Sequence, residues 1–202
     1  MAPRFIAKQL SRPTGFLGAV IRRMMNRHNA RMNAFAVHQL KLAPADRVLE
    51  IGFGGGITLP ALLNSAAFVA GVDRSADVIG WARRRFEQHI EADRAEFRHG
   101  NVEELPFDNA AFDKVCTVNT VYFWSSLTAG FSEIYRVLKP RGIVAVGFLP
   151  KERMDRMGMP EDIFTSRAPF DVVGALTKAG FRDPLIARPL PNTPWNVVVG
   201  TR

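Results

Sequence analysis

The segment 48–56 is the first place in the sequence where residue types and spacing could do chemistry. An apolar strand pattern at 48–51 runs directly into four glycines among five residues, Gly52, Gly54, Gly55 and Gly56. Glycine lets the chain turn sharply and lets a ligand approach the backbone closely. The pattern predicts a ligand-binding loop. The alternative interpretation is a tight turn from a strand into a helix with no ligand.

Glu50, two residues before the first glycine, separates two classes of ligand. Dinucleotide sites use the pattern GxGxxG and hold a diphosphate at the helix N-terminus. Counted from Gly52, the third glycine of that pattern falls on Ile57. A carboxylate would repel a diphosphate and would attract a cation. The loop therefore favours a positively charged ligand without phosphate.

Polar positions also follow the next two predicted strands. Asp73 comes after the strand pattern Phe68–Val72, 21 residues after Gly52. This spacing suits a carboxylate that accepts hydrogen bonds from both hydroxyls of a ribose; the alternative is a turn or cap residue. Asn101 and Val102 follow the third strand pattern. They could bracket an adenine, with the amide at its amino edge and the valine beneath its face.

Alternating strand and helix patterns must position these residues. Strands are expected at 47–51, 68–72, 96–98, 112–118, 143–148, 185–188 and 195–200, and helices at 16–40, 58–64, 75–92, 126–138 and 170–179. The proline- and glycine-containing segments 1–15 and 150–169 are expected to be irregular. The second of these contains three methionines, Met154, Met157 and Met159, and is either a mobile lid or a plain surface loop. The alternation predicts a mostly parallel sheet covered on both faces, with ligands at the carboxyl ends of the strands.

The net charge of +8 comes from the N-terminal region. Residues 1–47 contain nine Lys or Arg and one acid, Asp46, while the remaining 18 basic and 18 acidic residues cancel. We expect a basic arm and an amphipathic cap helix over 1–44, followed by one ligand-binding domain over 45–202. Arg23, Arg27 and Arg31 form a stripe on that helix. The arm could close the cleft, contact an anionic membrane, or be a targeting segment.

Composition excludes several other classes. The single cysteine, Cys116, rules out a disulfide framework and a thiolate zinc site within one chain. No apolar stretch approaches the ~18 residues of a membrane-spanning helix. No histidines and acids have convincing metal-ligand spacing, so no metal is expected. A cytoplasmic location is expected, with peripheral membrane contact as an open alternative.

Taken together, the ordered motifs resemble the class I S-adenosylmethionine-dependent methyltransferases, particularly the ubiquinone-biosynthesis-type (methyltransferase type 11) small-molecule group. The segments that carry the resemblance are 50–56, 71–75, 100–107, 112–115 and 136–142. The resemblance covers about 45–150, and 179–181 fits the end of that fold. It implies an α/β, Rossmann-like doubly wound seven-stranded sheet in the order 3-2-1-4-5-7-6, with an antiparallel last strand. It also implies an N-terminal cap helix and S-adenosylmethionine as cofactor.

The resemblance assigns roles to single residues. The cofactor-binding residues it implies are Glu50, Gly52, Phe53, Gly54, Asp73, Arg74, Asn101, Val102 and Asn119. The first loop would line the methionine part, Asp73 the ribose, and Asn101 with Val102 the adenine. Many family members have aspartate at position 101. Asparagine can still accept a hydrogen bond from the adenine amino group through its carbonyl oxygen.

Methyl transfer from a sulfonium is an in-line displacement that depends mainly on orientation, so a catalytic residue is not obligatory. A base is required only if the acceptor must lose a proton. The candidates for that role are Tyr122 and His28, although His28 is better explained as a packing residue. Tyr122, Phe123 and Trp124 are expected to line the substrate pocket, or else to be ordinary core aromatics.

Three functions remain open from the sequence. The leading one is methyl transfer to a small, apolar or lipid-like acceptor. The second is a nucleic-acid or protein methyltransferase that docks through the basic helix. Asn119 lacks the two prolines that follow the corresponding residue in many amino-group methyltransferases of DNA and protein, so nucleic acid is not expected as a partner. The third is a non-catalytic scaffold that binds S-adenosylmethionine.

Overall fold

The computed structural model describes residues 4–12 and 14–202, with the side chains at positions 16, 17, 19, 21–23 and 25–28 outside the described set. Its strands are β1 (Arg47–Ile51), β2 (Phe68–Asp73), β3 (Ala95–His99), β4 (Phe112–Val118), β5 (Leu138–Phe148), β6 (Arg182–Ala187) and β7 (Asn196–Thr201). Its α-helices are α1 (Arg4–Ser11), α2 (Gly15–Gln39), α3 (Leu59–Ser65), α4 (Ala76–Arg85), α5 (Glu87–Glu91), α6 (Leu127–Val137), α7 (Lys151–Arg156) and α8 (Pro169–Lys178). A 3-10 turn spans Val121–Phe123.

The strands form one seven-stranded sheet in the order β3-β2-β1-β4-β5-β7-β6. Strands β1 to β5 pair in parallel, and β7 runs antiparallel to both of its neighbours, β5 and β6. The expected α/β fold, strand order and antiparallel last strand are confirmed. The carboxyl ends of β1, β2 and β4 therefore meet at one edge of the sheet, where the candidate residues follow.

Alternation of side chains along each strand builds one apolar core on each face of the sheet. In β1, Leu49 packs in the core formed with α6 and α8, and Val48 packs in the core formed with α2, α3 and α4. Both side chains are fully buried. Successive residues of a strand point to opposite faces, so an almost continuous apolar run is needed for a sheet covered on both sides.

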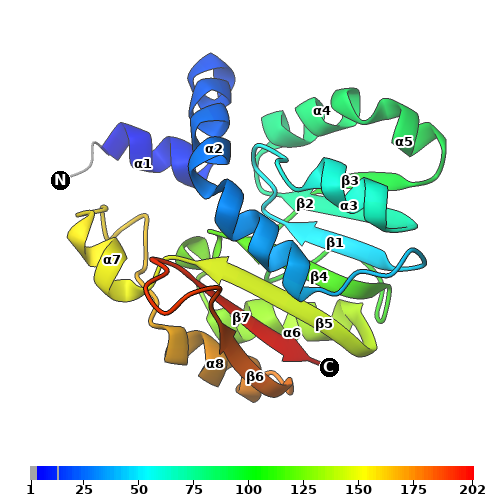
Figure 1. The fold of residues 1–202 in the computed structure, drawn as a ribbon. Helices are drawn as coiled ribbons and strands as arrows, with labels where there is room; N and C mark the ends of the chain where they lie inside the picture. Colours follow the sequence, from blue (N-terminus) through cyan, green and yellow to red (C-terminus); the bar gives the residue numbers. More distant parts are fainter. Residues whose placement is uncertain (1–3, 13) are drawn as a thin grey trace.

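The N-terminal helices lie against the sheet and over its carboxyl edge. The second half of α2 crosses the face of the sheet, packing against β4, β5 and β7 (Figure 1). Its buried residues there are Met32, Ala36 and Leu40. Helices α1 and α7 lie on the side of the molecule toward which β1 and β5 point (Figure 1). These two helices therefore lie where a ligand of the glycine loop would be covered.

Three of the segments that differ from the sequence expectations have an evident physical reason. Part of the segment 1–15 is helical: α1 has good helix formers and buries Ala7. The helix expected over 75–92 is broken at Phe86, whose ring is buried against Phe97 and Trp81. The 150–169 segment contains α7, which has an ion pair between Lys151 and Asp155.

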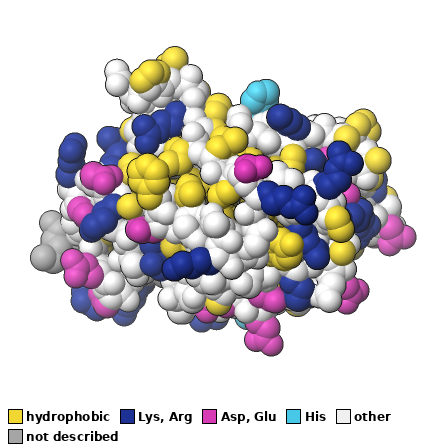
Figure 2. Space-filling model, turned by 90° about the horizontal axis from the view of Figure 1, so that it is seen from below, with side chains coloured by type: hydrophobic (Ala, Val, Ile, Leu, Met, Phe, Trp, Pro, Cys, Tyr) yellow, Lys and Arg dark blue, Asp and Glu magenta, His cyan; other side chains and the backbone are white. Residues whose placement is uncertain are grey.

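The surface away from the N-terminal helices has a mixed charge. On the face seen in Figure 2, Lys and Arg side chains are interspersed with Asp and Glu. This agrees with the balanced charge of residues 48–202 in the sequence. Among the helices of the described residues, none is long and apolar enough to cross a bilayer.

Candidate active site

Two adjoining cavities lie at the carboxyl edge of the sheet. The first has a volume of about 180 Å³ and the second about 110 Å³. The residues that line both are Leu10, Gly52, Gly54, Asn119 and Phe123. A ligand that occupies both cavities would therefore pass directly over the glycine loop.

The glycine loop is fixed by its own backbone geometry. Gly52 has a φ of +66°, in the left-handed region that favours glycine. Its N–H donates to the carbonyl of Val72 at 2.7 Å. A Cβ atom at this position would lie 2.4 Å from Cγ2 of Thr120, at the end of β4. Conformation and close approach thus both require glycine where β1 leaves the sheet.

Asp73 ties the end of β2 to this loop. One carboxylate oxygen accepts a hydrogen bond from the Gly54 N–H at 3.0 Å, and the other accepts one from the Ser75 N–H at 2.9 Å. Asp73 is only 6% exposed and lines the second cavity. Ser75 caps α4, because its side chain accepts from the Val78 N–H. The carboxylate is therefore oriented before any ligand arrives.

Glu50 is a buried acid on the wall of the first cavity. Oε1 accepts a hydrogen bond from the hydroxyl of Thr58, whereas Oε2 is buried without a hydrogen-bond partner among the described residues. Burial raises the pKa of Glu50 to about 8; the Thr58 hydrogen bond opposes this increase and the nearby Asp73 adds to it. An unpaired buried carboxylate is costly. A cationic ligand group would relieve that cost.

The second cavity contains the residues expected at an adenine. Asn101, Val102 and Arg74 line it together with Gly100. Val102 is 5% exposed and belongs to the core beneath the cavity. Asn101 is exposed, and its side-chain oxygen accepts from the Glu103 N–H at 3.4 Å. The structure thus brings the polar amide and the apolar floor to the same cavity as Asp73.

The remaining predicted cofactor residues are split between cavity and core. Phe53 lines the first cavity, yet its ring packs against Phe97 with the ring centroids 5.5 Å apart. It is 5% exposed, so its ring is mainly a core element. Asn119 follows β4 with a φ of +58° and lines both cavities. It therefore lies where the two cavities adjoin.

The three predicted substrate aromatics take different positions. Tyr122 and Phe123 line the first cavity. Trp124 lines the second and packs against Phe131, with the ring centroids 5.1 Å apart. The hydroxyl of Tyr122 donates to Asn119 Oδ1 or to the Leu149 carbonyl, and it accepts from the Leu149 N–H. These contacts join the segment that follows β4 to the residue that follows β5.

Tyr122 is poorly suited to act as a base. Burial raises the pKa of its phenol well above the ordinary value, although the hydrogen bond from the Leu149 backbone opposes that increase. The phenol therefore stays protonated at neutral pH. The other candidate base, His28, belongs to α2, but its side chain lies outside the described residues.

Several lining residues were not predicted as site residues. From α1 and α2 these are Gln9, Leu10, Asn29 and Asn33, and from the later part of the chain they are Leu149 and Phe164. The spacing of Asn29 and Asn33 places both on one face of a helix, which is the only sequence signal available for them. Met154, Met157 and Met159, predicted as part of a lid or loop, also line the first cavity. The described residues contain no group of three His, Cys, Asp or Glu side chains that could hold a metal.

The structure is an α/β fold with an acid at the glycine loop and another at the end of the second strand, both lining cavities at one edge of the sheet. Comparison with known proteins identifies the family of this chain. Residues 49–146 match the family described as "Methyltransferase domain". The chain is 31% identical over 131 residues to the uncharacterized methyltransferase YdaC of Bacillus subtilis, an alignment that covers 64% of this chain and 70% of that protein. The chain belongs to the class I S-adenosylmethionine-dependent methyltransferases, and S-adenosylmethionine is its cofactor.

Other relatives are longer, and one solved structure shows the same fold over nearly the whole chain. Sterol 24-C-methyltransferase ERG6B of Gibberella zeae is 31% identical over 118 residues, covering 58% of this chain and 31% of that enzyme. Apart from YdaC, the chain spans only 31% to 53% of the length of five further curated relatives. A chain from the complex of the Haloferax volcanii Trm112 methyltransferase activator with a methyltransferase has a TM-score of 0.77 and 18% identity, covering 97% of this chain and 96% of that one.

Proposed function

We propose that this enzyme transfers the methyl group of S-adenosylmethionine to a small apolar or lipid-like acceptor bound in the first cavity. The observation that carries the proposal is the lining of that cavity apart from Glu50 and the glycine loop. It consists mainly of apolar side chains, namely Leu10, Phe123, Leu149, Met154, Met157, Met159 and Phe164. Apolar walls stabilise an apolar ligand by removing its surface from water. The relationship to a sterol methyltransferase supports the same class of acceptor.

The described residues fit the cofactor. We assign the wall formed by Glu50, Gly52 and Gly54 to its methionine part, because the unpaired Glu50 carboxylate suits a cation and the glycines leave the backbone open. Asp73 is assigned to the ribose, and Asn101 with Val102 to the adenine. The bound cofactor supplies an electrophilic methyl group on a positively charged sulfur.

The chain itself contributes orientation and exclusion of water. Asn119 and Phe123 line both cavities, so they would contact the cofactor, which spans the two cavities, as well as an acceptor in the first cavity. Aligning the two reactants can supply several kcal/mol of the barrier reduction. Glu50 faces the cofactor side and Tyr122 is a neutral phenol with its hydroxyl engaged. We therefore assign no base among the described residues, and we assign Tyr122 as a positioning residue.

Replacing Asp73 with alanine is expected to weaken the binding of S-adenosylhomocysteine at least tenfold, about 1.4 kcal/mol. The change removes the ribose partner and also the acceptor of the Gly54 N–H. Isothermal titration calorimetry would measure the affinity. Asp108→Ala, an exposed acid outside both cavities, is the matched control and should bind normally. An unchanged affinity in Asp73→Ala would remove the ribose assignment.

The acceptor class can be tested without knowing the acceptor. The enzyme and methyl-labelled S-adenosylmethionine are incubated with an extract of the host cell, and the label is partitioned between organic solvent, water, protein and nucleic acid. We expect label in the organic phase with the wild type and background counts with Asp73→Ala. Label in protein or nucleic acid would overturn the proposal and favour docking of a macromolecule through the basic arm.

A further inference from the structure

The side of the molecule formed by α1 and α7 exposes apolar side chains that core packing does not explain. Phe5 and Ile6 in α1 are 55% and 38% exposed, and Met157, directly after α7, is 49% exposed. Helix α1 already contributes Ala7 to the core and Leu10 to the cavities. Phe5 and Ile6 are therefore additional apolar surface. A single exposed apolar residue is ordinary, but adjacent ones on the same short helix indicate a contact surface.

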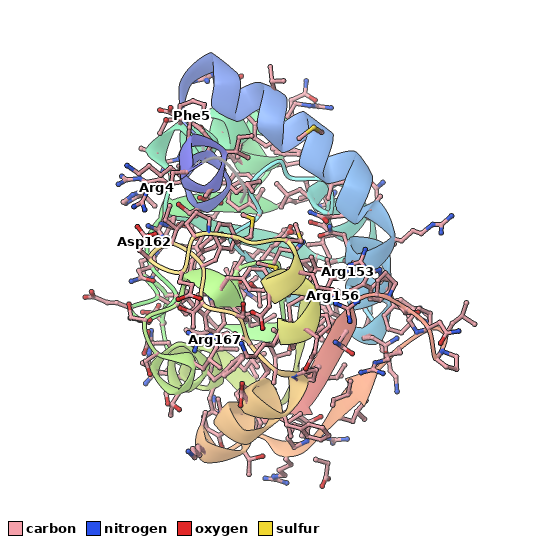
Figure 3. All side chains as sticks on the ribbon, turned by 90° about the vertical axis from the view of Figure 1, so that its left-hand side faces the viewer. Arg4, Phe5, Arg153, Arg156, Asp162 and Arg167 are labelled. Carbon is pink, nitrogen blue, oxygen red and sulfur yellow. The ribbon has the colours of Figure 1, made fainter. Side chains whose placement is uncertain are left out.

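An ion pair joins α1 to the segment that follows Met157. Arg4 forms an ion pair with Asp162, with an N–O distance of 2.5 Å, which fixes the start of α1 against the segment after α7. Figure 3 shows this pair, Phe5 and the two α7 arginines Arg153 and Arg156 on the same side of the molecule. Met157 both lines the first cavity and is half exposed. Met157 therefore lies where the first cavity meets the surface.

The charge of this face is positive because of residues 4–12, which comprise α1 and Arg12. Between residues 4 and 12 there are three basic side chains, Arg4, Lys8 and Arg12, and no acid. Lys8 and Arg12 are exposed and have no ion pair within the described residues. The segment 151–167 has four basic and four acidic side chains, so it adds no net charge. An exposed apolar pair beside unpaired basic groups is the chemistry of an interfacial helix.

We propose that the face made by α1 and the end of α7, here called the α1 face, docks on an anionic lipid bilayer. Phe5 and Ile6 would enter the headgroup region while Lys8 and Arg12 contact anionic headgroups. The entrance of the first cavity would then open toward the lipid, so an apolar acceptor could enter without crossing water. A nucleic acid would satisfy the basic groups but would leave the apolar pair in water. The role of the cavity entrance rests on the proposed function, whereas docking itself does not depend on it.

Sedimentation with vesicles tests the docking directly, using the full chain and no acceptor. We expect the protein to sediment with vesicles of equal parts phosphatidylcholine and phosphatidylserine at low salt, and to stay in solution with phosphatidylcholine alone. Lys8→Gln and Arg12→Gln should each weaken binding about fivefold. Phe5→Ser should weaken it about tenfold through lost apolar burial. Phe170→Ser, a 78% exposed phenylalanine on α8, is the matched control and should bind like the wild type.

Two results would overturn this proposal. One is a wild-type protein that ignores anionic vesicles at low salt; the other is an equal loss of binding in Phe5→Ser and Phe170→Ser. Because Phe5 and Phe170 are both exposed, neither substitution should unfold the chain, and thermal unfolding of each variant would verify this. Label in the organic phase without vesicle binding would refute docking alone. Vesicle binding together with label in protein or nucleic acid would refute the proposed acceptor alone.

Discussion

Binding of S-adenosylhomocysteine to the wild type is expected to tighten about fiftyfold between pH 6 and pH 8, and this dependence should disappear in Glu50→Gln. The pKa of Glu50 in the unliganded protein is raised to about 8, mainly by burial. At pH 6 the side chain is therefore protonated and must lose its proton before it can pair with the ligand ammonium. Each pH unit below the pKa then costs about a factor of ten in affinity. Isothermal titration calorimetry between pH 6 and pH 8 measures how the affinity changes with pH in the wild type and in Glu50→Gln.

Two further variants test whether Glu50 is the group that causes this pH dependence. Thr58→Val removes the hydrogen bond that lowers the pKa of Glu50, so the midpoint of the pH dependence should move to higher pH. Glu104→Gln changes an exposed glutamate and should keep the wild-type slope. If wild type and Glu50→Gln show the same slope, Glu50 is not the group that pairs with the ligand.

The same acid should affect the stability of the unliganded protein. Between its unfolded pKa, near 4.5, and its folded pKa, about 8, the folded state holds a proton that the unfolded state has lost. The contribution of Glu50 to the free energy of unfolding should therefore fall as pH rises, by at most about 1.4 kcal/mol per pH unit in this window. Urea unfolding of wild type and Glu50→Gln at several pH values would show the difference.

Gly52→Ala is expected to weaken S-adenosylhomocysteine binding about a hundredfold, about 2.7 kcal/mol. Alanine in the left-handed conformation of Gly52 costs ~1–2 kcal/mol. Its Cβ would also lie 2.4 Å from Thr120 Cγ2, so the end of β4 must shift. Thr120 forms a hydroxyl–hydroxyl hydrogen bond with Thr117 and directly follows Asn119, which lines both cavities. The substitution should therefore displace the junction of the two cavities as well as the loop.

A second substitution separates the two causes. Thr120→Ser removes Cγ2 and keeps the hydroxyl, so Gly52→Ala/Thr120→Ser should recover the part of the affinity lost to the close contact but not the part due to backbone strain. Gly174→Ala, in α8 with nothing within 4 Å of the added Cβ, should bind normally. Wild-type affinity in Gly52→Ala would refute the loop assignment.

The local motifs could be predicted from the sequence because each depends only on residues close together in the chain. The apolar run 48–51, the glycines behind it and Asp73 after the next strand are determined by strand period and turn chemistry, and the strand order followed from the family resemblance. Even so, the sequence could not show that Asp73 binds the Gly54 N–H or that Gly52 lies against Thr120. Both contacts join different strand ends, which only the folded sheet brings together.

The sequence by itself determined the family, the sheet and the positions of Glu50, Gly52, Asp73 and Asn101 on the chain. The tertiary structure decided what covers them: α1, treated as irregular in the sequence, lines both cavities through Leu10. It also decided that Oε2 of Glu50 lacks a partner and that Trp124 packs against Phe131. The physical reason is that helix pattern and glycine spacing are local properties, whereas burial and cavity shape depend on contacts such as Arg4 with Asp162, 158 residues apart.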